Sequence, residues 1–169
     1  MVKKIIWALV FILAAALFQS TILSRLAAYI HAVPDLALCI LVYTAYVNGT
    51  MTGQLTGFFS GIMLDCLSAA PLGFNTFIRT LTGGLAGFMK GTFYLDPFFL
   101  PMVLCACATI LKAAVCYLLH LLFSGATPAY SLFELTFWIE LGLNTLLAPF
   151  LFALLRMFQP LLADRRENS

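Results

Sequence analysis

Long apolar stretches, separated by short polar or turn-forming segments, make up almost the whole chain. A helix of about 20 apolar residues crosses the roughly 30 Å hydrocarbon core of a bilayer. The pattern predicts one all-α integral membrane domain, residues 1–160, built as a six-transmembrane-helix bundle. The predicted spans are residues 5–23, 34–48, 50–67, 72–89, 102–123 and 132–158, and residues 161–169 form a polar tail.

The second span is the shortest of the six, because 15 residues of helix reach only about 22 Å. We expect it either to extend back into residues 27–33 or to lie where the bilayer is thin. Pro34 is predicted in its first turn, where a missing N–H is tolerated. Residues 24–31 and 91–101 are predicted to lie at the membrane surface, and residues 124–128 to form a turn.

The composition agrees with lipid as the solvent of this chain. Hydrophobic residues make up 63% and charged residues 9% of the sequence, against about 25% charged residues in soluble domains. A net charge of +2 without a basic patch gives no reason to expect a nucleic-acid partner. Lys3 and Lys4 precede the first apolar run as in a signal peptide, but no small-residue cleavage site follows, so we expect an uncleaved span.

Basic residues predict the orientation of the six spans, since Lys and Arg are enriched in cytoplasmic segments. Only Arg25 would lie outside if both termini are cytoplasmic. The residues then placed inside are Lys3, Lys4, Lys90, Arg156, Arg165 and Arg166.

Arg79, Lys112 and Glu140 lie well inside predicted spans, where a charge usually faces the bundle interior and is paired. Lys112 and Glu140 differ by about 6 Å in depth on consecutive antiparallel helices, so we predict that they form an ion pair. Arg79 could pair with Asp35 or with Asp65. Such charges could serve a ligand site or a proton path, but we favour pairing that fixes helix register.

The polar and small residues of these spans follow helical spacing. Arg79 shares a stripe with Asn75, Gly83 and Gly87, Lys112 with Cys105, Thr109, Cys116 and His120, and Glu140 with Thr136, Asn144 and Ala148. In the third span, steps of four residues join Gly49, Gly53, Gly57 and Gly61 and then reach Asp65.

Glycines at that spacing let helix backbones approach closely in lipid. The row drifts around the helix, so one neighbouring helix could cross it obliquely or two could share it. Gly83, Gly84, Gly87 and Gly91 provide similar small-residue spacing in the fourth span.

Residue patterns typical of enzymes or metal sites are absent from the sequence. It contains no nucleophile elbow, phosphate-binding loop, HExxH or dinucleotide-binding glycine motif. The two histidines are isolated, and the five cysteines form no CxxC, so we predict no metal, cofactor or catalytic residue. The histidines are His31 and His120, and the cysteines are Cys39, Cys66, Cys105, Cys107 and Cys116.

The order of short motifs resembles a known family. Gln19 lies late in the first span, Pro34-Asp35-Leu36 opens the second, the glycine row fills the third, and Pro71-Leu72-Gly73 opens the fourth. This layout resembles the rod shape-determining protein MreD family. The likeness covers most of the chain in layout, with residue matches between Gln19 and Gly73.

The resemblance implies a non-enzymatic member of the bacterial cell-elongation machinery in the cytoplasmic (inner) membrane. Its implied partners are a single-span MreC-like protein and, in the same machinery, MreB, RodA and a class B penicillin-binding protein. It also implies a fold similar to the substrate-binding (S) subunits of energy-coupling-factor transporters. The positions matching the family pattern, Pro34, Asp35, Gly57, Gly61, Asp65 and Gly73, are expected to shape helix packing.

Two other functions remain open from the sequence. An S subunit for a vitamin would dock its transporter through an AxxxA motif, for which Ala16-xxx-Ser20 is a weak match. A lipid-modifying enzyme would have to build its site from residues such as Asp65, Arg79 and Glu140, and no reaction suggests itself.

Overall fold

A computed structural model describes residues 2–23, 32–68, 70–91, 98–123 and 134–162. The predicted surface segment 24–31, most of the linker 91–101, the turn 124–128 and the tail from residue 163 lie outside the described residues. Within these ranges every regular element is a helix. The helices are α1 (Val2–Phe18), η1 (Gln19–Leu23), α3 (Leu36–Asn48), α4 (Thr50–Leu67), α5 (Phe74–Phe88), α6 (Phe99–Leu122), α7 (Leu135–Met157) and α8 (Gln159–Leu162).

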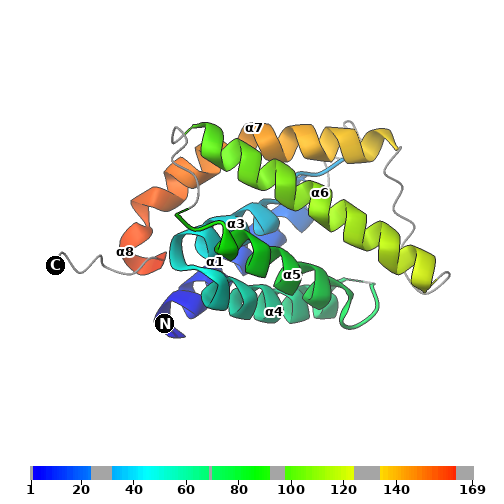
Figure 1. Cartoon of the computed structure of the whole chain (residues 1–169), viewed down its shortest axis with the longest axis horizontal. Coiled ribbons are helices and arrows are strands. Elements are labelled where there is room, and N and C mark those ends of the chain that lie inside the picture. The colour runs from blue at the N-terminus through cyan, green and yellow to red at the C-terminus, as the bar shows by residue number, and fades with distance from the viewer. Residues whose placement is uncertain (1, 24–31, 69, 92–97, 124–133, 163–169) are drawn as a thin grey trace.

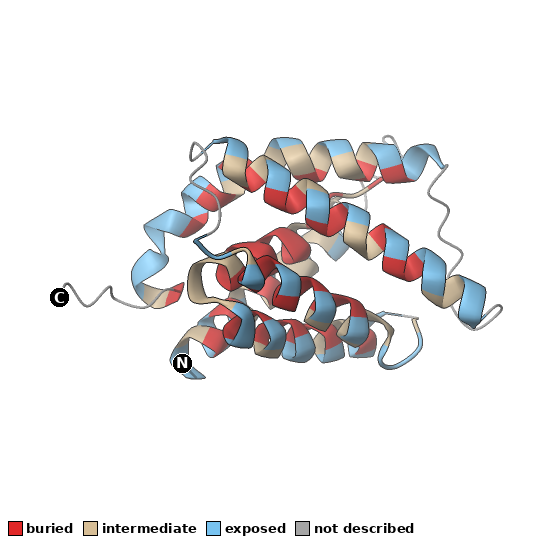
Figure 2. Ribbon diagram, viewed as in Figure 1, coloured by how far each residue is buried: buried red, intermediate tan, exposed pale blue. Residues whose placement is uncertain are grey.

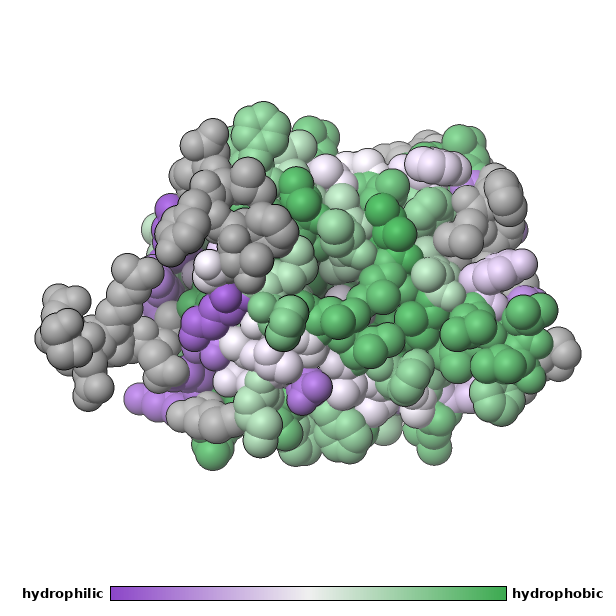
Figure 3. Space-filling view, in the orientation of Figure 1, coloured by the Kyte–Doolittle hydropathy of each residue, from purple (hydrophilic) through white to green (hydrophobic). Residues whose placement is uncertain are grey.

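Among the described residues, three helices are long and apolar enough to cross a bilayer. They are α1 with the start of η1, α6 and α7. Large apolar side chains are widely exposed on the bundle, and green apolar residues cover much of the face seen in Figure 3. An all-helical membrane protein is therefore confirmed, while a count of six spans stays a prediction.

The short helix α3 lies at the centre of the bundle, packed against α1, α4, α5, α6 and α7 (Figure 1). Residues 37–45 of α3 are all buried, and Figure 2 shows the middle of the helix in the buried colour. A helix that is apolar all round is a core helix. Its 13 residues span only about 20 Å, and neighbouring helices cover that length.

Pro34 does not lie in the first turn of α3, so this detail of the sequence prediction is wrong. Asp35 is the N-cap, because its side chain accepts a hydrogen bond from the Leu38 N–H, and the helix begins at Leu36. Pro34 is buried just before the cap. At the other end, a single residue, Gly49, joins α3 to α4 with a φ of 98°, a value that favours glycine.

The glycine row of α4 packs along the antiparallel helix α5, and Gly53 also faces Ala45 of α3. A Cβ built at Gly53 would overlap the carbonyl oxygen of Gly83, and one at Gly57 would overlap that of Arg79. One at Gly61 would overlap the backbone of Thr76. Each step of four along α4 thus moves the contact about four residues back along α5, so the backbones touch along most of both helices.

Gly57→Ala tests this close contact, with Gly142→Ala as a matched control. A Cβ at Gly142 on α7 would meet nothing within 4 Å. In both helices alanine gains about 0.5–1 kcal/mol of helix propensity over glycine. At Gly57 the overlap outweighs that gain, because overpacking costs about 1–3 kcal/mol. We expect Gly57→Ala to lower the melting temperature in detergent and Gly142→Ala to leave it unchanged or raise it. Equal melting temperatures would contradict the close backbone contact.

Candidate functional site

Four ionisable side chains from four parts of the chain meet inside the bundle. Asp35 Oδ1 lies 3.0 Å from Arg79 Nη2, and Asp35 Oδ2 lies 2.9 Å from Lys112 Nζ. Lys112 Nζ also lies 2.7 Å from Glu140 Oε1. We call Asp35, Arg79, Lys112 and Glu140 the charge network. Its two carboxylates and two cations sum to zero charge.

The network ties together elements that are distant in sequence. Asp35 caps α3, Arg79 comes from α5, Lys112 from α6 and Glu140 from α7. Asp35, Arg79 and Glu140 are each 7% exposed or less. At such burial an unpaired charge is costly, so the four side chains hold their helices at matching depth.

The sequence predicted part of this arrangement. The Lys112–Glu140 ion pair is confirmed. Of the two partners considered for Arg79, the structure selects Asp35, so pairing with Asp65 is wrong. The contact between Lys112 and Asp35 was not predicted, because nothing in the sequence places α6 against the start of α3.

Neutral polar groups extend the network around Asp35. The Asp35 N–H donates to Asn144 Oδ1 at 2.8 Å, and Asn144 Nδ2 donates to Thr109 Oγ1 at 3.0 Å. Thr109 and Asn144 are fully buried. Gln19 Oε1 accepts from the Leu36 N–H at 3.2 Å, which ties η1 to the start of α3. The sequence placed Thr109 on the helical stripe of Lys112 and Asn144 on that of Glu140, but it did not predict the hydrogen bond between Thr109 and Asn144.

Asp65 lies outside the charge network and holds the start of α5 instead. Its carboxylate accepts hydrogen bonds from the backbone N–H groups of Gly73, Asn75 and Thr76 at 2.8–3.1 Å. The Thr76 hydroxyl donates to it at 2.6 Å. Three of the N–H groups at the N-terminal end of α5 thus gain a charged acceptor, the kind of group that the helix dipole favours there.

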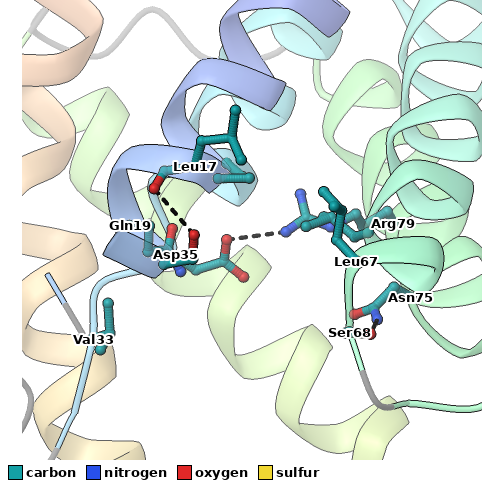
Figure 4. Close-up of a pocket in the computed structure, with 12 residues that line it drawn as sticks. Leu17, Gln19, Val33, Asp35, Leu67, Ser68, Asn75 and Arg79 are labelled. Atoms are coloured by element: carbon teal, nitrogen blue, oxygen red, sulfur yellow. Dashed lines mark hydrogen bonds and ion pairs between the residues drawn. The ribbon is translucent and has the colours of Figure 1, made fainter. Parts of the chain in front are cut away.

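A cavity of about 430 Å³ lies beside Asp35 and Arg79. In Figure 4 their side chains point toward each other, with Gln19 beside Asp35 and with Ser68 and Asn75 below Arg79. We call this space the Arg79 cavity. Its polar lining comes from Gln19, Ser20, Asp35, Ser68, Asn75 and Arg79, and its apolar lining from Ala16, Leu17, Val33, Ala37, Leu64 and Leu67.

The described residues contain no group of three His, Cys, Asp or Glu side chains placed to hold a metal ion. All five cysteines lie in the described part and are free thiols. The four charges pair with one another, and two of them, Asp35 and Arg79, also line the Arg79 cavity.

Comparison with known proteins identifies the family. The family model described as rod shape-determining protein MreD matches residues 1–158 of the 169-residue chain. The chain belongs to the MreD family. As a member, it is a membrane protein of the rod-shape machinery. The MreD family consists of shape-determining proteins and is not a known enzyme family. No curated protein and no solved structure matches the chain.

The positions that carried the resemblance to MreD occupy three structural settings. Pro34 and Asp35 lie at the buried start of α3, where the charge network meets. Gly49, Gly53, Gly57 and Gly61 lie at the turn into α4 and along its contact with α5. Asp65 and Gly73 form the connection between α4 and α5, where Gly73 has a φ of 97°. That these positions matter for MreD function stays a prediction.

Asp35→Asn and Glu140→Gln are matched changes from carboxylate to amide that test the network. Asp35→Asn removes the negative charge beside both Arg79 and Lys112, whereas Glu140→Gln leaves Lys112 with Asp35. Removing one partner of a buried pair costs about 3–5 kcal/mol. We expect Asp35→Asn to lower thermal stability in detergent clearly more than Glu140→Gln. A smaller loss for Asp35→Asn than for Glu140→Gln would show that Asp35 is not the central partner.

Proposed function

We propose that this MreD-family chain is a non-enzymatic membrane scaffold of bacterial cell elongation. In this proposal it binds an MreC-like single-span protein and so supports peptidoglycan synthesis, with RodA and a class B penicillin-binding protein nearby in the machinery. The observation that carries the proposal is the charge network itself. Its ionisable groups pair with one another at 2.7–3.0 Å across four elements, and this supports a role in holding helices together.

A docking place for the partner's span is the line of contact between α5 and α6. Two apolar crevices of about 320 and 340 Å³ lie along it. The first is lined by residues such as Leu85, Met89 and Leu104, and the second, toward the other end, by residues such as Phe77 and Leu119. We call this line the α5–α6 seam. An apolar helix laid along it would fill both crevices by van der Waals packing, which drives association in lipid.

The proposed topology has six spans with both termini in the cytoplasm. Lys90 lies beside Gly49, because the Lys90 Cδ is 3.5 Å from the position that a Cβ would take at Gly49. Arg156 lines a cavity together with Val47 near the end of α3. Asn48 also bonds the Leu162 carbonyl oxygen. The ends of α3, α5 and α7 therefore gather at one end of the bundle with basic residues, which supports a cytoplasmic location for it.

Leu85→Trp and Leu146→Trp form a matched pair that tests the seam. Both leucines are exposed, at 47% and 62%, but Leu85 lines a seam crevice and Leu146 lies on α7. We expect Leu85→Trp to reduce co-purification of a tagged MreC-like protein and to give rounded cells in complementation. Leu146→Trp should behave as wild type, because Leu146 lines neither crevice of the seam.

Equal recovery of the partner with both variants would rule out the seam. Failure of the wild-type chain to co-purify with the partner, together with normal cell shape after clean deletion, would rule out the scaffold itself.

Single cysteines test the topology in a background without the five native cysteines. Ser68→Cys lies after α4, at the Asp65 end, and Lys90→Cys lies after α5, at the Gly49 end. In intact spheroplasts we expect a membrane-impermeant maleimide to label Ser68→Cys alone, and permeabilisation to expose Lys90→Cys. The reverse pattern would invert the proposed orientation.

A second candidate function is that of a vitamin-binding S subunit of an energy-coupling-factor transporter. The Arg79 cavity is the observation that favours it, together with the proposed likeness of fold. Isothermal titration of the purified chain with vitamins separates the two candidates. Nanomolar binding would replace the scaffold proposal, and its absence would leave the S-subunit function without support.

A further inference from the structure

Arg79 has a donor group that the charge network does not use. Its Nη2 bonds Asp35, but Nη1 is buried and has no hydrogen-bond partner within the described structure. The residue as a whole is 6% exposed. Leaving a buried charged donor without an acceptor is costly, and such groups are rare in native proteins. Since Arg79 lines the Arg79 cavity, an acceptor from a ligand in that cavity would satisfy Nη1.

The other polar groups around the cavity also suit an acceptor-rich ligand. The Oε1 of Gln19 is already used by the Leu36 N–H, so its amide NH₂ is the group left to offer. Ser68 and Asn75 add a hydroxyl and an amide to the lining and bond each other at 3.4 Å, while the Ser20 hydroxyl donates to the Leu17 carbonyl oxygen. Phosphate oxygens accept several hydrogen bonds at once and pair strongly with the guanidinium of arginine.

The apolar part of the lining indicates that the ligand comes from the bilayer. Leu17 and Leu67 are 48% and 58% exposed and belong to the ends of α1 and α4. Ser20 and Ser68 are also exposed, so the mouth of the cavity lies between η1 and the end of α4. A ligand with acyl chains could lay them along these leucines while its polar head enters the cavity.

The depth of Arg79 agrees with a headgroup ligand. It lies five residues after the first residue of α5, or about 8 Å along the helix axis. The polar layers of a bilayer add about 5–8 Å on each side of the hydrocarbon core. The guanidinium is therefore within reach of the phosphate and glycerol level of one leaflet.

We propose that the Arg79 cavity binds the headgroup of a phospholipid, with a phosphate oxygen accepting a hydrogen bond from Arg79 Nη1. The charge network already sums to zero, so an anionic headgroup would add an uncompensated charge at a buried site. A zwitterionic headgroup such as phosphoethanolamine keeps the sum at zero. The site is separate from the α5–α6 seam and does not depend on the scaffold proposal.

Lipid binding to the full chain, purified in detergent and delipidated, tests this site. Native mass spectrometry would compare dioleoyl-phosphatidylethanolamine, dioleoyl-phosphatidylglycerol, dioleoylglycerol and soluble phosphoethanolamine. We expect dioleoyl-phosphatidylethanolamine to bind most tightly. Dioleoylglycerol should bind about tenfold more weakly, because it has no phosphate to accept the charge-assisted hydrogen bond from Arg79. Soluble phosphoethanolamine should bind more weakly than the lipid, because it lacks acyl chains.

Two variants and one control locate the binding. Ser20→Trp blocks the cavity mouth without touching the charge network, and Thr21→Trp places the same bulk one residue on, outside the lining. In the wild type the hydroxyls of Ser20 and Thr21 both donate to the Leu17 carbonyl oxygen, so each tryptophan variant loses the same hydrogen bond. Arg79→Lys keeps the charge beside Asp35 but has no second terminal nitrogen. We expect about tenfold weaker lipid binding for Ser20→Trp and Arg79→Lys, and wild-type binding for Thr21→Trp.

Several results would overturn the proposal. They are wild-type lipid affinity in both Ser20→Trp and Arg79→Lys, equal affinity for the diacylglycerol, and tighter binding of phosphatidylglycerol or of the soluble headgroup. Melting temperatures measured in parallel identify any variant that fails to fold, and the diacylglycerol comparison on the wild-type chain decides the question without a variant.

Discussion

The need to compensate a buried carboxylate organises this bundle. Asp35 caps the central helix α3 and lies between two cations, Arg79 from α5 and Lys112 from α6. Because a bare charge at this depth is expensive, those helices can pack only where their cations reach Asp35. Glu140 then compensates the remaining charge of Lys112 and brings α7 to the same level.

Close packing of small residues supplies what the ion pairs do not. In lipid no hydrophobic effect draws helices together, so α4 and α5 adhere through backbone contact at Gly53, Gly57 and Gly61. Asp65 joins the two helices at the connecting loop, because its carboxylate accepts hydrogen bonds from the N–H groups at the start of α5. The result is a rigid helical hairpin against which α3 packs and from which Arg79 projects toward Asp35.

Two of the cavities between the described helices differ in chemistry. The α5–α6 seam is apolar and suits a helix, whereas the Arg79 cavity carries a spare guanidinium donor and suits an acceptor-bearing lipid. A scaffold that holds a partner helix at one place and a lipid at another would work by adhesion alone.

The sequence by itself determined the all-helical class, the positions of the apolar segments, the family and the Lys112–Glu140 pair. It could do so because helical rise and hydrophobic periodicity are local properties, and depth on consecutive antiparallel helices follows from counting residues. Only the tertiary structure decided that Arg79 pairs with Asp35 and not with Asp65, that α3 is central, and that Arg79 lines a cavity with its Nη1 unpaired. In the sequence pattern Asp35 lies at the start of its span and Asp65 near the end of the next, so antiparallel spans bring both carboxylates toward the same side of the membrane. The choice between them depends on how α3, α4 and α5 pack side by side.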